Sequence, residues 1–319
     1  MRLLLVLALL LPELARADFR SRIALAFDGW LTEHHVPRGV LVLLRNGLPV
    51  VEVERGVRAD PPVELASVGK SLTALCVAAL VAQGRLSYDA RLETYLGPDA
   101  PEATLGDLLT HSAGLLQDST QTLMSGWSND PAPRHDAVTA LVLQRGAGVP
   151  GEYHYSNEDY ALLGTIIAQA ADRPYRAVCH DAVIDPMGLT TARPSPVTGA
   201  FAPWGGWAMS AHDAARLQWL GFGKGARLGG DPLAFPHIEE GYGAFYGMGM
   251  VFRPFRDAFN FWHFGALCFG NGPQIGTYTV SWMYEYTLLV YYEACVPFRT
   301  MAALDKAMTA AVYNQGATE

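Results

Sequence analysis

The sequence carries little charge and no basic cluster. Only 17% of its 319 residues are charged, the net charge is −8, and no long run of like charges occurs. Such a chain is not expected to bind nucleic acid or an anionic membrane surface. Half of the residues are hydrophobic, which is enough for a large buried core. The composition therefore indicates a globular protein.

Long apolar segments are missing beyond the first residues, so no membrane span is expected, because a span needs roughly 20 apolar residues. Residues 1–17 combine one early cation, an apolar run from Leu3 to Leu11 and a final Ala-Arg-Ala sequence. This layout is typical of a secretory signal peptide that is cleaved after Ala17. We therefore expect an exported protein, periplasmic or secreted, whose mature chain starts at Asp18.

Cysteine is scarce. Four cysteines (Cys76, Cys179, Cys268 and Cys295) are too few to form a disulfide framework in an exported chain of this size. Cys76 lies within an apolar helical pattern, and we expect it to be a small core residue. One bridge among the other three is compatible with export, but their spacing does not assign it.

Several catalytic motifs are absent. The sequence has neither a His-Glu-x-x-His zinc motif nor a Gly-x-Ser-x-Gly nucleophile motif. Gly69-Lys70-Ser71 matches the end of a phosphate-binding loop, but Glu64 stands where that loop needs its first glycine. Nucleotide binding is therefore excluded, and we expect no metal and no cofactor.

Apolar periodicity predicts the first elements. Residues 19–31 have helical spacing, and residues 39–56 form two β-branched runs joined at Asn46-Gly47, a strong hairpin signal. Residues 67–83 predict a helix that is apolar almost all round, ended by Gly84. Such a helix is expected at the centre of the structure.

The rest of the chain predicts a helical block followed by strands. Helices and loops are expected over residues 85–215, three strands between residues 260 and 294, and a last helix from residue 298. We predict one catalytic domain with an α+β fold. Residues 18–66 and 201–319 would form an antiparallel sheet flanked by terminal helices, and residues 67–200 would form an inserted, mainly helical subdomain.

The stretch "ELASVGKSLTALCVAAL" places Ser67 one helical turn before Lys70. Side chains three residues apart share a helix face, at about 5–6 Å between Cβ atoms. A serine hydroxyl needs a neighbour that accepts its proton, and burial disfavours the charged form of lysine, so this pair can activate a nucleophile. An N-capping serine followed by an ordinary lysine has the same spacing, so the motif alone does not decide.

Two further triplets strengthen the catalytic interpretation. In Tyr155-Ser156-Asn157, a tyrosine near a lysine can act as a general base, and the asparagine can position the lysine and a substrate amide. His263-Phe264-Gly265 suits a strand that a substrate lies against. The alternatives are that Tyr155 is a half-buried aromatic residue, that Asn157 is a helix cap and that His263 is a strand histidine without a catalytic role.

Together these elements resemble the serine β-lactamase and penicillin-binding-protein superfamily, in the branch of class C β-lactamases, D,D-peptidases and family VIII esterases. In that branch the second element is Tyr-x-Asn, and the third is often His-x-Gly. Other segments resemble the family in the same order, among them "TLGDLLTHSAGL", "DPMGLTTA", "GGWAMSAHDAARL" and "YGMGM". The resemblance covers nearly the whole chain after residue 17.

The resemblance implies a role for each motif residue and a β-lactamase-like fold with the site in a cleft. Ser67 would be the nucleophile, Lys70 its proton-transfer partner and Tyr155 the general base. Asn157 would organise the substrate and the lysine.

On the substrate side, the resemblance implies that His263 takes the place of a strand cation, followed by Gly265. The backbone N–H groups of Ser67 and Ala266 would form the oxyanion hole. Two departures bear on the substrate. Phe264 replaces a hydroxyl residue that would bond a substrate carboxylate, and a histidine is mostly neutral near pH 7.

We therefore expect an exported serine hydrolase that forms an acyl-enzyme on Ser67 and acts on small esters or amides. A β-lactamase or D-alanyl peptidase is the alternative within this chemistry. A non-catalytic binding protein of the same fold is the alternative of another class. The expected partner is a small acyl substrate, and the expected state is a monomer.

Overall fold

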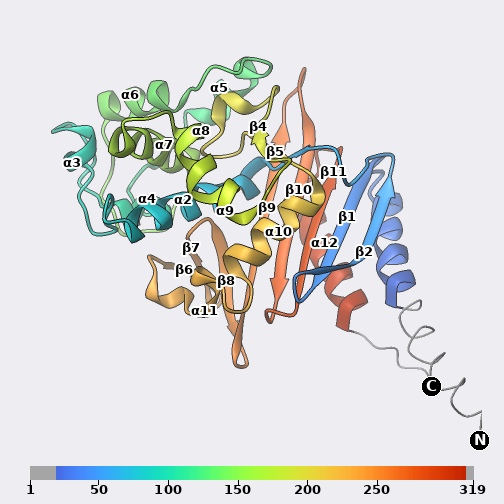
Figure 1. Ribbon diagram of the computed structural model, residues 1–319. Coiled ribbons are helices and arrows are strands. Elements are labelled where there is room, and N and C mark those ends of the chain that lie inside the picture. The colour runs from blue at the N-terminus through green and yellow to red at the C-terminus, as the bar shows by residue number, and fades with distance from the viewer. Residues whose placement is uncertain (1–18, 314–319) are drawn as a thin grey trace, which may run out of the picture.

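An eight-stranded antiparallel sheet organises the structure, a computed structural model that describes residues 19–313 (Figure 1). The strand order is β2-β1-β11-β10-β9-β8-β7-β6. The strands span Gly39–Arg45 (β1), Leu48–Arg55 (β2), Ile238–Gly241 (β6), Ala244–Gly247 (β7), Met250–Phe255 (β8), Ala258–Cys268 (β9), Gln274–Trp282 (β10) and Tyr286–Tyr292 (β11).

The predicted hairpin at Asn46-Gly47 is confirmed. Strands β1 and β2 pair antiparallel on either side of it, and both turn residues have positive φ, 50° and 78°. This is the backbone that a tight hairpin turn requires and that Asn-Gly adopts most readily. Leu41 and Leu43 face one side of the sheet, whereas Val40 and Val42 face the other.

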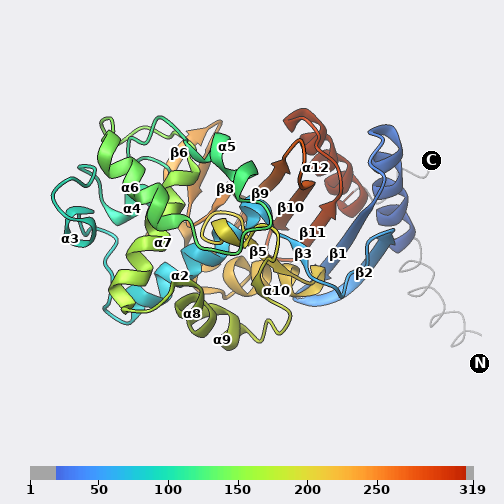
Figure 2. The same cartoon turned by 90° about the horizontal axis from the view of Figure 1, so that it is seen from above.

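Each face of the sheet is covered by helices (Figure 2). On one face lie a helix over residues 19–33 and the last helix, α12 (Phe298–Tyr313), and the Trp30 Nε1 atom donates to the Thr300 carbonyl between them at 2.9 Å. The expected apolar stripe of α12, which includes Leu304 and Met308, is buried there. The other face packs against α10 (Ala211–Phe222) and the helical part of the chain.

Most of the remaining helices lie between residues 66 and 187. They are the 3₁₀-helix η1 (Ala66–Gly69), α2 (Lys70–Ala82), α3 (Glu93–Leu96), α4 (Leu105–Leu109), α5 (Thr120–Leu123), η2 (Met124–Trp127), α6 (His135–Arg145), α7 (Asn157–Ala171), α8 (Tyr175–Cys179), η3 (His180–Ile184) and α9 (Asp185–Met187). A small three-stranded sheet of β3 (Val63–Glu64), β5 (Trp207–Met209) and β4 (Arg193–Pro194) lies where the chain enters and leaves this region. The α+β fold agrees with the prediction, and the exact division into two subdomains stays a prediction.

Helix α2 is the buried central helix that the sequence predicted, although its first turn is the separate 3₁₀-turn η1. Its residues are buried almost all round, from Lys70 to Leu80. Gly84 follows its end with a φ of 70°, as expected for a helix terminator.

Two expectations about the fold were wrong. Strands β6 to β8 extend the sheet beyond the three later strands that the pattern predicted. The cysteines form two disulfides, Cys76–Cys179 and Cys268–Cys295, so Cys76 is not a free core residue. The expected signal peptide lies outside the described residues. Within residues 19–313, no helix is both long and apolar enough to cross a membrane.

Candidate active site

A pocket of about 390 Å³ opens where η1, α7 and strand β9 meet, and its lining includes Ser67, Tyr155 and Asn157. The predicted strand residues His263, Gly265 and Ala266 line it as well. Lys70 is fully buried and lies behind Ser67. The structure thus brings together all seven residues that the sequence singled out, from three distant segments.

The Ser67 hydroxyl is held in place by a strained backbone at Ala66 and by strand β9, which passes close to it. Ala66 has a φ of 46°, a left-handed conformation that residues other than glycine rarely adopt and that is typical of functional sites. Strand β9 passes so close that a Cβ atom on Gly265 would lie 2.8 Å from the Ser67 nitrogen. Only glycine fits there, which explains the third motif.

Beyond Trp262, strand β9 pairs with β10 alone, because its pairing with β8 ends at that residue. Among the described strands, none covers the other edge of residues 263–268. An open strand edge beside Ser67 can hydrogen-bond an extended substrate through its backbone.

Lys70 has three oxygen neighbours around its Nζ atom. Nζ lies 2.6 Å from Asn157 Oδ1, 3.0 Å from the Trp204 carbonyl oxygen and 3.3 Å from Ser67 Oγ. The amide and carbonyl oxygens only accept hydrogen bonds, whereas the serine hydroxyl can also donate. A neutral Lys70 would give its two hydrogens to these acceptors and keep its lone pair for the Ser67 proton.

Electrostatics favour that neutral form. Burial lowers the pKa of Lys70 to about 7, and negative charge at Asp118 or Asp159 would oppose this shift. A large share of Lys70 is therefore deprotonated at neutral pH, as a general base requires.

Tyr155 also lies at Ser67 and shares a hydrogen bond with it. Its ring centroid is 4.8 Å from Lys70 Nζ. Burial raises the pKa of its phenol, and a hydrogen bond with Ser67 only partly offsets this. A phenol in this environment stays protonated, so the structure favours Lys70 over Tyr155 as the first proton acceptor. Tyr155 is then suited to pass a proton to a leaving group.

Asn157 is oriented by two residues that sequence reasoning missed. Its Nδ2 atom donates to Thr120 Oγ1 at 3.0 Å, and Thr120 donates in turn to Asp118 Oδ1 at 2.6 Å. The other oxygen of Asp118 accepts from the Asn157 backbone N–H at 3.1 Å. These bonds fix the amide so that its oxygen faces Lys70. No pattern in the sequence pointed to Asp118 or Thr120.

His263 lines the pocket, but both of its ring nitrogens are already bonded. Nδ1 donates to the Phe264 carbonyl at 2.7 Å, and Nε2 lies 3.3 Å from the Tyr246 hydroxyl. Burial, followed by the charge of Lys70, lowers the pKa of His263 to about 3. His263 is thus neutral in this structure, and it does not offer a substrate the cation of a strand lysine.

The Phe264 side chain lines the pocket on one side and packs against residues of the far face of the sheet on the other. Its ring stacks on Tyr278 at 4.5 Å between centroids and meets Phe298 of α12 edge-on at 5.6 Å. Phe264 and Phe298 both line the pocket. The first turn of α12 therefore contributes a wall that the sequence did not predict.

Eight of the 20 described lining residues of the pocket are aromatic, and the charge of the lining is negative. Among its described lining residues, Glu240 of β6 is the only carboxylate, and none is lysine or arginine. Trp204 and Trp262 line the pocket, whereas Trp207 and Phe261 are buried in the core.

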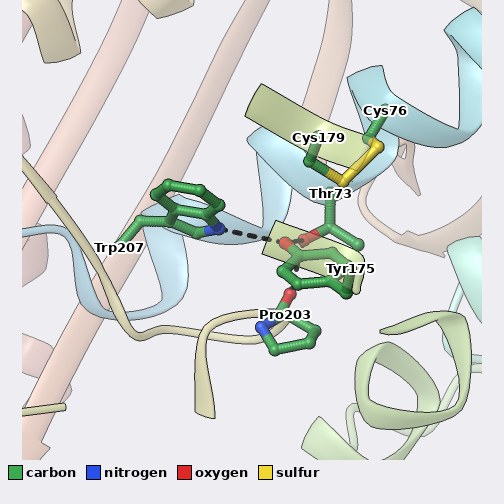
Figure 3. Close-up of a disulfide and its surroundings, with 6 residues drawn as sticks. All are labelled: Thr73, Cys76, Tyr175, Cys179, Pro203 and Trp207. Carbon is green, nitrogen blue, oxygen red and sulfur yellow. Dashed lines mark hydrogen bonds between the residues drawn. A yellow bond between two sulfur atoms is a disulfide. The ribbon is translucent and has the colours of Figure 1, made fainter. Parts of the chain in front are cut away.

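A disulfide and a hydrogen-bond cluster lie on the side of α2 that faces α8 (Figure 3). Thr73 bonds Tyr175 and the Pro203 carbonyl, both at 2.7 Å, and the Trp207 indole donates to Tyr175 at 3.0 Å. Because Pro203 directly precedes Trp204, these contacts also hold the carbonyl that bonds Lys70.

A possible metal-binding group among the described residues is His180, Asp181 and Asp185. Its two carboxylates are exposed and do not line the pocket. Exposed acidic groups are common without a metal, so this group adds nothing to the site.

Comparison with known proteins identifies the family. A sequence profile described as Beta-lactamase matches residues 23–278. The chain belongs to the beta-lactamase family. It is 32% identical over 180 residues to penicillin-binding protein 4 of Amycolatopsis lactamdurans, which covers 51% of this chain and 46% of that protein. It is 28% identical over 203 residues to esterase EstB of Burkholderia gladioli, which covers 56% of this chain and 52% of the esterase. The matches span about half the length of these relatives.

Solved structures agree on the fold. A class C beta-lactamase from Rhodobacter sphaeroides superposes with a TM-score of 0.71 at 19% identity, covering 91% of this chain and 99% of the other. The D-amino acid amidase of Ochrobactrum anthropi gives a TM-score of 0.71 at 17% identity, covering 92% and 99%. The resemblance that the motifs suggested is confirmed, and so is the β-lactamase-like fold.

Proposed function

We propose that the protein is an exported serine hydrolase that forms an acyl-enzyme on Ser67. The observation that carries this proposal is the position of Lys70, whose buried amine lies 3.3 Å from Ser67 Oγ while its two other partners only accept hydrogen bonds. A binding protein of the same fold would need no buried amine with a pKa near 7 beside a serine.

The proposed reaction has two halves. Neutral Lys70 takes the proton from Ser67 Oγ as the oxygen attacks the substrate carbonyl, and backbone N–H groups of Ser67 and Ala266 bind the negative charge. Tyr155 passes a proton to the leaving alcohol or amine and receives the proton that Lys70 took, so both return to their neutral forms while the acyl group stays on Ser67. A water molecule then adds to the ester carbonyl and gives its proton to neutral Lys70, which returns a proton to Ser67 Oγ as the acid is released.

We propose small, uncharged esters or amides as substrates. Among the described lining residues of the pocket, no lysine or arginine is present to bind a substrate carboxylate, and Glu240 would repel one. His263 is neutral, and Phe264 has no hydroxyl. The aromatic lining suits an apolar acyl or alcohol group. The esterase and the amidase among the proteins that this chain resembles support these two substrate classes.

A β-lactamase or D-alanyl peptidase is the second candidate. The relatives named penicillin-binding protein and the class C beta-lactamase structure favour it. The open edge of β9 could bind the backbone of such a substrate. These substrates carry a carboxylate, however, and this pocket provides no cation among its described lining residues to bind it.

Export is proposed on two grounds. Residues 1–17 have the layout of a signal peptide, and two disulfides suit an oxidising compartment.

Intact mass spectrometry tests the proposal. The protein lacking residues 1–17 is exposed to a fluorophosphonate and, separately, to a penicillin, beside a Ser67→Ala variant. We expect one fluorophosphonate adduct on the peptide that contains Ser67 and none in the variant. Hydrolysis of p-nitrophenyl acetate should exceed that of nitrocefin. Labelling that persists in Ser67→Ala would overturn the mechanism, and efficient nitrocefin hydrolysis would favour the second candidate.

A further inference from the structure

A chain of buried polar side chains runs from helix α7 to the pocket. Asp159 Oδ2 lies 2.7 Å from His111 Nδ1, and His111 Nε2 lies 3.2 Å from the Tyr246 hydroxyl. That hydroxyl lies 3.3 Å from His263 Nε2. His263 Nδ1 ends the chain at the carbonyl of Phe264, at 2.7 Å.

The pocket end fixes the direction of these bonds. A backbone carbonyl accepts hydrogen bonds and never donates, so the hydrogen of His263 is on Nδ1. Neutral His263 then accepts at Nε2, and the Tyr246 hydroxyl must donate to it. The oxygen of Tyr246 is left to accept from His111, which therefore carries a hydrogen on Nε2.

The other end leaves two possibilities for His111. Either its Nδ1 carries a second hydrogen and the pair is an ion pair, or Nδ1 accepts and Asp159 holds the proton. The backbone N–H of Ser156, an obligate donor, points at the same Nδ1 atom from 3.4 Å. If His111 Nδ1 accepts this hydrogen bond, it carries no hydrogen of its own, so the carboxyl group of Asp159 must donate to it.

The surroundings of the Asp159 carboxyl group also favour its neutral form. Asp159 is 1% exposed, and its second oxygen, Oδ1, is buried without a hydrogen-bond partner. An ionised carboxylate with one orphaned oxygen would be very unfavourable in this setting, and a neutral acid much less so. Burial also raises the pKa of Asp159 and lowers that of His111. Both shifts oppose an ion pair.

We propose that Asp159 is a neutral carboxylic acid that donates to His111 and orients a one-way hydrogen-bond chain ending at His263. In this role Asp159 is a positioning residue, because it acts on the site through its neighbours. The chain keeps the wall of the pocket beside Lys70 free of charge. An ionised Asp159 would hold Lys70 in its ammonium form and weaken it as a base.

Several charged and titratable groups face this pair from the elements around it. They come from α2, α4, α7 and the neighbouring loops and strands, and the charged ones act on Asp159 or on His111. They are Lys70, Asp107, Asp118, Tyr153, His154, Tyr155, Glu158, Tyr160, Tyr246 and His263. A test must therefore separate Asp159 from the rest.

Asparagine makes that separation, because its amide can donate to His111 as a neutral acid does and carries no charge. The readout is the rate of fluorophosphonate labelling against pH, which rests on the proposed function. We expect the midpoint of Asp159→Asn to stay within about 0.3 pH units of the wild type. Asp159→Ala removes the donor and should slow labelling about tenfold or more. Asp118→Asn is the positive control, since losing a charge that raises the pKa of Lys70 should lower the midpoint.

A second measurement does not depend on catalytic activity. Nitrogen-15 NMR of histidine side chains, assigned by the signals lost in His111→Gln, should show a hydrogen on Nε2 of His111 and none on Nδ1. A doubly protonated His111, or a midpoint that falls by a full unit in Asp159→Asn, would overturn the inference. If wild-type Ser67 fails to label, the proposed function fails, and the NMR result still tests the state of Asp159.

Discussion

The shortest polar contact of Lys70 is with Asn157, at 2.6 Å between Nζ and Oδ1. An amide oxygen accepts a hydrogen from either form of the amine, so this contact holds Lys70 in place without fixing its charge. The choice of asparagine rather than aspartate is therefore part of how the site keeps the pKa of Lys70 near 7.

Asn157→Asp tests this role directly. A carboxylate at 2.6 Å would favour the ammonium form and raise the pKa of Lys70 by about 1–3 units. Because the neutral amine is the proposed base, the labelling rate should rise with pH around a midpoint near 7 in the wild type. In the variant that midpoint should lie at least one unit higher. An unmoved midpoint would mean that another group accepts the serine proton.

Lys70 and Tyr155 should behave as one unit. Each lies at the Ser67 hydroxyl, so either Lys70→Ala or Tyr155→Phe breaks the same proton path. We expect each change to lower kcat for a p-nitrophenyl ester by orders of magnitude. The double variant should lose far less than the product of the two losses. Strictly multiplicative losses would show that the two residues act independently.

The charge of Glu240 should select against substrates that carry a carboxylate. Glu240→Gln removes that charge, and at an exposed position the gain for nitrocefin is expected to be about fivefold, roughly 1 kcal/mol. The gain should shrink at high salt, and hydrolysis of neutral esters should change little. Glu239→Gln is the matched control, because Glu239 lies beside Glu240 on β6 but does not line the pocket. Equal effects of both changes would contradict a local role.

The Cys76–Cys179 bridge should stabilise the protein more than the Cys268–Cys295 bridge. The first closes 103 residues and the second closes 27. Loop entropy alone predicts about 4.7 kcal/mol for a loop of about 100 residues and about 3–4 kcal/mol for the shorter one. Urea unfolding of Cys76→Ala/Cys179→Ala and of Cys268→Ala/Cys295→Ala measures both. Equal losses would show that native-state effects outweigh chain entropy.

Local spacing made part of this site predictable. Ser67 and Lys70 are one helical turn apart, and Tyr155 and Asn157 are two residues apart, so short motifs report their chemistry. The hairpin at Asn46-Gly47 was equally local.

The remaining features depend on long-range contacts that no local pattern encodes. Asp159, His111, Tyr246 and His263 come from four segments, and a buried polar residue looks like any other polar residue in a sequence. Cys76 has the spacing of an apolar core residue, and only the approach of α8 makes it a disulfide partner. Strands β6 to β8 were missed because glycines at 241, 243, 247 and 249 interrupt their alternation.

The wall that Phe298 and Met301 contribute to the pocket is far in the sequence from the residues that carry the proposed chemistry. Both residues belong to the first turn of α12, more than 30 residues after the last catalytic motif in the sequence. Substitutions there reshape the space for the acyl or alcohol group and leave the bonds around Lys70 untouched. Changes in the last helix can therefore alter which substrates fit without changing the proposed nucleophile or its base.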